Sequence, residues 1–334
     1  MVTRRPALFM AALGLLLVSA CDAGPEATGA ASERLNVATS VAPITSIAAN
    51  IGGSRVQIEG IVPEGTNSHT FEPAPQVAAL LSTADVILIN GLQLEEPIKE
   101  LALDNMKDDA VLVEIGDEVL PREDWIFDFS FPEEDGKPNP HLWTDPTYAI
   151  KYAEAISEVF SNEDPANADY YEKNLDAFTK RATALGEALM ADQKSVPEGN
   201  LKLLTYHDAY AYFAETYGWE VIGAVQPKNF EDPTPQEVAA LIDQVEVENV
   251  PTIFGSEVFP SAVLEEIGRA TGAEYEATLR DDDLPGEPGD ADHSWLGLMT
   301  YNYVTMIEGL GGTANRLSQV DTTDVGPDEA EYPQ

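Results

Sequence analysis

Short apolar segments alternate with helix-like patterns along most of the chain. Helical spacing follows several of these segments, as in residues 43–51, which end at Gly52 and Gly53. Four segments are expected to be strands: 35–39, 86–89, 201–205 and 252–254. Strands that alternate with helices predict α/β units with parallel sheets.

One motif occurs twice. Residues 71–80 read FEPAPQVAAL, and residues 230–241 read FEDPTPQEVAAL. Each copy leads into a helical pattern and then an expected strand. In the second copy, Thr234 and Glu237 have the spacing of a capping box, with Pro235 at the first helical position. Two copies of one α/β unit predict two pseudo-symmetric lobes.

A long helical pattern lies between the two copies. Asp164 is expected to cap this helix and Pro165 to begin it, and apolar residues then recur at spacings of four and three. A helix over residues 165–192 would be about 42 Å long, which would limit hinge motion between lobes. We expect an N-terminal lobe (34–162), a linking helix (163–196) and a C-terminal lobe (197–317).

The N-terminus has the pattern of an export signal. Two arginines precede an apolar run over residues 7–18, which is shorter than the roughly 20 residues needed to cross a bilayer. Small residues and then Cys21, the chain's only cysteine, follow this run, as in a bacterial lipobox. We expect residues 1–20 to be a signal peptide, Cys21 to carry lipid, and residues 21–33 to form a tether. An ordinary signal peptide with a chance cysteine is the alternative.

Composition narrows the classes of partner. The chain has 59 acidic and 18 basic residues and a net charge of −41, which argues against a nucleic-acid partner. Hydrophobic residues make up 44%, enough for folded cores. Residues 318–334 are acidic and lack an apolar period, so we expect a disordered tail there.

Aromatic residues alternate with polar ones over residues 121–140, and six acidic residues surround them. The alternation favours a small surface strand or flap with a solvated acidic side. A weak role of these acids in capturing metal is the alternative.

The four histidines are the candidate metal ligands. His69, His141 and His207 lie in loop-like contexts, whereas His293 precedes the last helical pattern and is expected to cap it or to face solvent. No two histidines have the spacing of a zinc finger or of a His-Glu-x-x-His helix. Spacing alone therefore does not establish a metal site.

The segments around these histidines are more specific. In chain order they are GTNSHTFEP (65–73), Ala84-Asp85 with Asn90-Gly91-Leu92 and Glu95, NPHLW (139–143), and TYHDAY (205–210) with Tyr217-Gly218. They resemble motifs of the metal-binding lipoproteins of ABC importers for zinc and manganese, the cluster A-I substrate-binding proteins. The resemblance extends from Leu35 to about Leu310. It implies a two-lobed solute-binding protein that is not an enzyme.

The resemblance also implies four protein ligands in the cleft between the lobes. His69 and His141 would come from the first lobe, and His207 and an aspartate from the second. The family's aspartate stands two residues before an aliphatic residue. Asp282 has this position ahead of Leu284, and its neighbours at 281 and 283 are the alternatives.

The third ligand distinguishes the metals in this family. Zinc-binding members have a histidine there, and manganese-binding members have a glutamate after a strand. Ser256 aligns with that glutamate, and Glu257 is one residue late. Imidazole ligands suit Zn²⁺, whereas Mn²⁺ prefers more oxygen ligands. His207 therefore favours zinc, and Glu257 is the first alternative if no residue of 281–283 is a ligand.

We therefore expect an extracytoplasmic zinc-binding protein, lipid-anchored to the cell membrane, that delivers Zn²⁺ to an ABC-type importer. Its expected partners are the permease and a zinc metallochaperone, and we expect a monomer. A manganese- or iron-binding protein of the same family, a zinc-dependent hydrolase and a cell-surface adhesin are the alternatives. Four protein ligands argue against the hydrolase, because catalytic zinc keeps an open coordination position.

Overall fold

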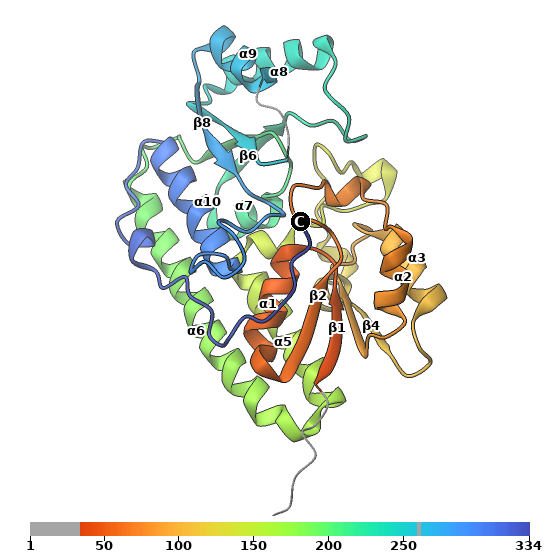
Figure 1. Cartoon of the computed structure of the whole chain (residues 1–334). Helices are drawn as coiled ribbons and strands as arrows, with labels where there is room; N and C mark the ends of the chain where they lie inside the picture. Colours follow the sequence, from red (N-terminus) through yellow and green to blue (C-terminus); the bar gives the residue numbers. More distant parts are fainter. Residues whose placement is uncertain (1–33, 259–261) are drawn as a thin grey trace, which may run out of the picture. The chain divides into compact units, whose positions relative to one another are not determined.

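The computed structural model describes residues 34–258 and 262–334, and within them two parallel sheets form two α/β lobes (Figure 1). The first sheet contains β1 (Leu35–Thr39), β2 (Val56–Gly60), β3 (Val86–Ile89) and β4 (Val111–Glu114). The second contains β5 (Lys202–Thr205), β6 (Glu220–Ala224), β7 (Thr252–Ser256) and β8 (Glu274–Leu279). The strand orders are β2-β1-β3-β4 and β6-β5-β7-β8. Both lobes therefore have the same strand order, in agreement with the two pseudo-symmetric lobes predicted from the duplicated motif.

Helices cover these sheets. Those before the second sheet are α1 (Ala42–Gly52), α2 (Pro75–Leu81), α3 (Glu96–Asn105), α4 (Ile115–Val119), α5 (Pro146–Glu163) and α6 (Ala168–Asp192). The helices that follow β5, the first strand of the second sheet, are α7 (Ala211–Tyr217), α8 (Pro235–Glu248), α9 (Ala262–Thr271) and α10 (Trp295–Gly309). The capping box expected at Thr234 and Glu237 is present at the start of α8.

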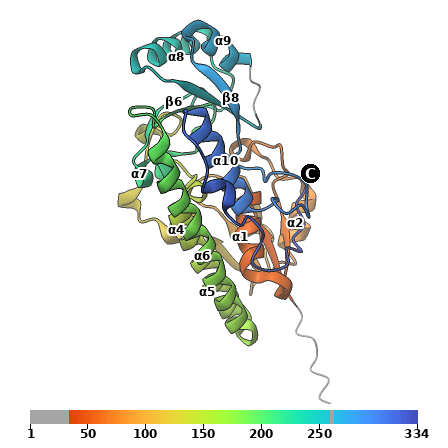
Figure 2. The same cartoon turned by 90° about the vertical axis from the view of Figure 1, so that its left-hand side faces the viewer.

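The long helix predicted between the two motif copies is confirmed as α6. It packs against α5, α1 and α10 (Figure 2). Its buried Phe178 ring lies 5.4 Å from the ring of Trp295 in α10. Asp164 does not cap α6: it follows the last residue of α5, and a short 3-10 turn over Pro165–Asn167 intervenes. Its carboxylate accepts hydrogen bonds from Asn167 and Tyr171, which stabilises this corner between the two helices.

One hydrophobic core extends through both lobes, and a smaller cluster lies in the outer part of the second lobe. Buried hydrogen bonds also join the two lobes. The indole nitrogen of Trp143 donates to the carbonyl of Asp281 at 2.9 Å, and that of Trp295 donates to the carbonyl of Trp143 at 2.9 Å. Tyr303 donates to the carbonyl of Thr144 at 2.6 Å. These bonds hold the segment after His141 beside the loop that contains Asp281.

The prediction of a disordered tail over residues 318–334 is wrong. Val325 N donates to Asn50 Oδ1 at 2.9 Å, and Glu331 pairs with the free edge of β2, donating to Ile58 O and accepting from Gly60 N, both at 2.9 Å. The tail passes alongside α1 and ends near the end of β2 (Figure 1). An open sheet edge supplies the hydrogen bonds, so an acidic segment without apolar periodicity is held in place.

The prediction of a strand over residues 121–140 is also wrong, although five of the six acidic residues of this segment are exposed, as predicted. This segment, which the structure describes throughout, contains 3-10 turns and no strand. Phe131 is buried, and Ser130 bonds to the second lobe: its N–H donates to Asp208 Oδ2 at 3.0 Å and its hydroxyl to Gln226 O at 2.8 Å. Of the alternating aromatic residues, Phe131 thus packs at the contact between the lobes, whereas Phe129 is 49% exposed.

The expected signal peptide, lipidated Cys21 and tether lie outside the described residues. Within the described part of the chain, no helix has both the length and the hydropathy needed to cross a membrane.

Candidate metal centre

Loops at the facing ends of the two lobes position three histidines. His69 lies in a 3-10 turn (Ser68–Thr70) between β2 and α2, and the turn is capped by Asn67, whose Oδ1 accepts from His69 N at 3.0 Å. His141 lies in the loop before α5, and His207 follows β5 directly. Ligand sites of open α/β sheets lie beyond the carboxyl ends of strands. His69 and His207 lie in loops that follow β2 and β5, and His141 lies next to them.

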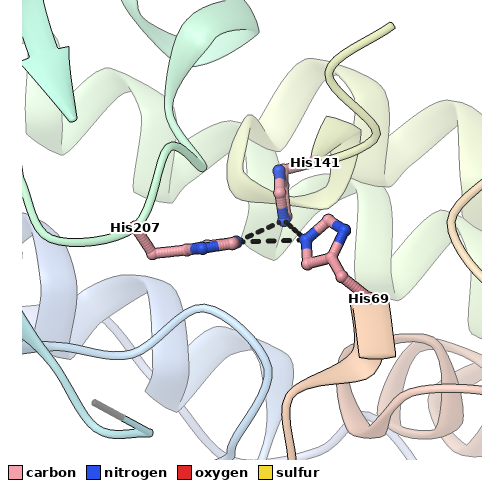
Figure 3. A group of neighbouring side chains, drawn as sticks. All are labelled: His69, His141 and His207. Carbon is pink, nitrogen blue, oxygen red and sulfur yellow. Dashed lines mark hydrogen bonds between the residues drawn. The ribbon is translucent and has the colours of Figure 1, made fainter. Parts of the chain in front are cut away.

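The three imidazoles point their Nε2 atoms at one another (Figure 3). The Nε2–Nε2 distances are 3.1 Å for His69 and His141, 3.2 Å for His69 and His207, and 2.9 Å for His141 and His207. Nitrogens bound tetrahedrally to one zinc ion at 2.0–2.1 Å would be separated by about 3.3 Å. Among the described residues, these three form the group of metal-ligating side chains whose ligand atoms lie together.

Two side-chain amides orient two of these rings. His141 Nδ1 lies 2.8 Å from Asn139 Oδ1, and His207 Nδ1 lies 2.5 Å from Gln226 Oε1. The orientation of Asn139 follows from its other bonds, because its Nδ2 donates to Asp208 O and to Asp128 Oδ2. A ring that donates its Nδ1 proton to an amide oxygen presents the Nε2 lone pair. Both rings therefore have the tautomer that binds metal through Nε2.

The three histidines are neutral near pH 7. Burial lowers the pKa of His207 to about 4, against the opposing effect of its hydrogen bond to Gln226. Burial also lowers the pKa values of His69 and His141 well below the usual range, and charge repulsion from the neighbouring histidines adds to this effect. Only the neutral form of imidazole can bind a metal, so the three histidine rings are in their binding form at this pH.

Three consecutive aspartates of the second lobe, 281–283, lie in one loop, and the first of them is close to the histidines. Asp281 Oδ2 lies 3.7 Å from His207 Nε2. Asp283 points elsewhere, because both its carboxylate oxygens accept from Gly65 N, at 2.9 and 2.8 Å. Asp282 is 5% exposed, and its Oδ1 has no hydrogen-bond partner among the described residues. The loop thus offers two carboxylates, Asp281 and Asp282, that are not bound to Gly65.

Burial raises the pKa of all three aspartates. The value is about 7 for Asp282, where the nearby Ser68 opposes the shift, and about 7 for Asp283. For Asp281 the pKa lies well above its usual range, because repulsion from Glu257 and the two neighbours adds to burial. Several carboxyl groups that are buried together favour a cation beside them.

Glu257 stabilises the aspartate loop. Its Oε1 accepts from the backbone N–H groups of the three residues 281–283, at 2.8, 3.2 and 3.3 Å. Its Oε2 lies 3.0 Å from the hydroxyl of Ser256, which donates to it. The glutamate thus holds the backbone of the loop, and its oxygens are already engaged there.

Comparison with known proteins agrees with this geometry. The family model described as zinc-uptake complex component A, periplasmic, matches residues 37–309. The chain belongs to this family. It is therefore a metal-binding substrate-binding protein of ABC importers and not an enzyme, and the predicted family and two-lobed fold are confirmed.

Similar proteins carry different metals in their names. The manganese-binding lipoprotein MntA of Halalkalibacterium halodurans is 28% identical over 295 residues, covering 88% of this chain and 95% of the relative. The iron-binding protein YfeA of Yersinia pestis is 28% identical over 310 residues, covering 92% and 96%. The solved structure of the periplasmic zinc-binding protein TroA from Treponema pallidum matches with a TM-score of 0.75 and 23% identity, covering 83% and 99%. The metal of this family member has to be argued from its own site.

The structure separates His293 from this site. It is buried, its Nδ1 lies 3.2 Å from Pro285 O, and its ring contacts Tyr332 of the tail. It neither faces solvent nor caps α10, because Ser294 is the cap residue and accepts from Gly297 N.

Sequence reasoning missed the residues that surround the histidines. The Phe230 ring stacks on His69 at 4.4 Å with an interplanar angle of 12°, and Phe131 lies 5.5 Å from His69. Asn139 could have been found from its place two residues before His141. Gln226 has no such local signal, because the pairing of β5 with β6 brings it to His207.

Proposed function

We propose that this chain binds Zn²⁺ at His69, His141 and His207 and delivers it to an ABC-type importer. The observation that carries this proposal is the convergence of three imidazole Nε2 atoms within 2.9–3.2 Å, with the two buried rings oriented by amide oxygens. Three neutral nitrogen donors suit zinc better than manganese, which prefers oxygen ligands.

The position of Glu257 supports the same choice. A manganese site of this family type would use a glutamate after β7 as a ligand. Here the oxygens of Glu257 accept from three backbone N–H groups and from Ser256. To bind a metal, this side chain would have to give up the bonds that hold the aspartate loop.

We propose Asp282 as the fourth ligand. Its carboxylate is buried, and its Oδ1 lacks a hydrogen-bond partner among the described residues, which is the state expected of a ligand oxygen before metal arrives. Asp281 is the second candidate, because its Oδ2 lies 3.7 Å from His207 Nε2. An N···O distance of about 3.3 Å is expected across a tetrahedral zinc ion.

The cellular setting also belongs to the proposal. Manganese-binding relatives are named as lipoproteins, which supports lipid anchoring through Cys21 and an extracytoplasmic location. The partner that follows from an importer is its permease, and a zinc metallochaperone would be a further partner. We propose that the protein acts as a monomer.

Metal analysis of protein purified without added metal tests the zinc assignment. We expect one zinc per chain, a melting temperature that rises with zinc, and reversal by chelator. A ligand present at about a thousandfold above its dissociation constant stabilises the folded state by about 4 kcal/mol. Manganese or iron in place of zinc would reject the zinc assignment and leave the importer function standing.

A further inference from the structure

A cavity of about 330 Å³ lies beside the metal centre. Its wall includes His69, Phe131 and Phe230, and residues of both lobes contribute to it. His141 and His207 are 0% and 2% exposed, whereas His69 is partly exposed and lines the cavity. The cavity is therefore the approach to the metal site from the side of His69.

The size and the walls of this cavity do not match a lone cation. Its volume equals that of roughly eleven water molecules, more than one hydrated ion requires. Four prolines, two phenylalanines and two leucines form much of the wall. Such surfaces suit the carbon skeleton of an organic molecule, and the two carboxylates of the wall, Glu96 and Asp135, lie at ion-pairing distance from lysines.

Backbone strain is concentrated at the same wall. Among the described residues, four that are not glycine have a positive φ: Leu92, Gln93, Phe230 and Asn249. The first three line this cavity, at φ values of 52°, 63° and 58°. Asn249 lies elsewhere, at the C-terminal cap of α8. Left-handed backbone at bulky residues is unfavourable and clusters at ligand sites, so its concentration here points to a binding function.

The charges on the wall leave one cation without a partner. Lys228 pairs with Asp135 across the lobes at 2.9 Å, and Glu96 lies 3.8 Å from Lys99. Lys137 forms no ion pair with any described residue, in a chain with 59 acidic and only 18 basic residues. An unpaired ammonium group at the entrance to a cation site repels a free cation and attracts a carboxylate.

We propose that this cavity is a subsite for a small carboxylate-bearing organic chelator that accompanies the metal. Lys137 binds a carboxylate of the chelator, and the proline and phenylalanine surfaces hold its carbon skeleton. The metal then faces His69. This inference rests on the proposed zinc-binding function and names the form in which the metal reaches the site.

Citrate is the probe, and its binding to zinc-loaded protein is measured by calorimetry. We expect saturable binding that Lys137→Ala weakens about tenfold, the loss of one charged hydrogen bond at a partly solvated site. Lys173→Ala, an exposed lysine on α6 outside the cavity, is the matched control and leaves citrate binding unchanged. Zinc supplied without citrate binds both variants at least as tightly as wild type.

Three results would overturn the subsite: no saturable citrate binding to zinc-loaded wild type, equal citrate affinity of wild type and Lys137→Ala, or displacement of citrate by inorganic phosphate at equal concentration. In each of these cases zinc binding itself is intact, so the proposed function stands. Failure of wild type to bind zinc at all would instead overturn the proposed function, and the subsite with it.

Discussion

The orientation of His207 by Gln226 leads to a sharp prediction. The Gln226 side chain forms one hydrogen bond with the described residues, in which its Oε1 accepts from His207 Nδ1. Its backbone bonds to Tyr206 and Ser130 do not depend on the side chain. Gln226→Met keeps nearly the same volume and removes the acceptor. Gln226→Glu keeps an acceptor and offers no N–H group.

The expected loss of zinc affinity follows from the hydrogen bonds that His207 can form in the metal-free and in the zinc-bound protein. Gln226 is 2% exposed, so water does not replace the lost acceptor. In the metal-free variant, His207 can move its proton to Nε2 and donate it to a neighbouring histidine. In the zinc-bound variant Nε2 is occupied, and a buried Nδ1–H is left unpaired at a cost of about 1–3 kcal/mol. Gln226→Met should therefore weaken zinc binding about 10- to 100-fold, the usual range for a residue that orients a metal ligand.

Competition with a chromogenic zinc chelator at fixed pH and salt measures this loss. Gln226→Glu is the matched control, and we expect it to bind zinc at least as tightly as wild type, because a carboxylate can only accept from Nδ1. The melting temperature of each metal-free variant checks that the fold is retained. Wild-type affinity in Gln226→Met, or weaker binding by Gln226→Glu than by Gln226→Met, would refute the reasoning.

Four further predictions follow from the same structure. Asp282→Ala should weaken zinc binding more than Asp281→Ala in the same competition assay, and the reverse order would assign the fourth ligand to Asp281. Zinc affinity should fall as the pH drops through about 7, because the raised pKa of Asp282 lets protons compete there, and fall again near pH 4, where His207 takes up a proton. A zinc affinity that stays constant between pH 4 and pH 8 would contradict this prediction. Removal of residues 321–334 should lower the melting temperature, since the bonds to β2 and α1 are lost; an unchanged value would mean that the tail adds no stability. Cys21→Ser should move the protein from the membrane fraction to the soluble one, and retention in the membrane would reject the lipobox.

Local patterns in the sequence were sufficient for much of the fold. The apolar segments at 35–39 and 86–89 are β1 and β3, and the segment at 252–254 lies within β7. The apolar spacing of four and three after residue 165 predicted α6, and the repeated motif predicted two pseudo-symmetric lobes, whose sheets have the same strand order in the structure. These features depend on residues close together in the chain, and the same is true of the motifs that carry His69, His141 and His207.

The predictions failed for segments whose hydrogen-bonding partners lie far away in the sequence. The tail is ordered because β2 has a free edge, and the segment over 121–140 is packed because Asp208 and Gln226 bond to Ser130. Neither partner can be inferred from the composition of the segment itself. The lobe boundaries, and Asp282 as the fourth ligand, stay predictions.

The sequence by itself determined which residues are able to bind a metal: three histidines in specific motifs, and three adjacent aspartates. Only the tertiary structure decided how they are used. It brings the three Nε2 atoms together, turns Asp283 to Gly65 and engages Glu257 with the aspartate loop. It also places Gln226 behind His207 by pairing β5 with β6. The physical reason is that coordination depends on where lone pairs point, and the direction of a lone pair is set by hydrogen bonds between segments far apart in the chain.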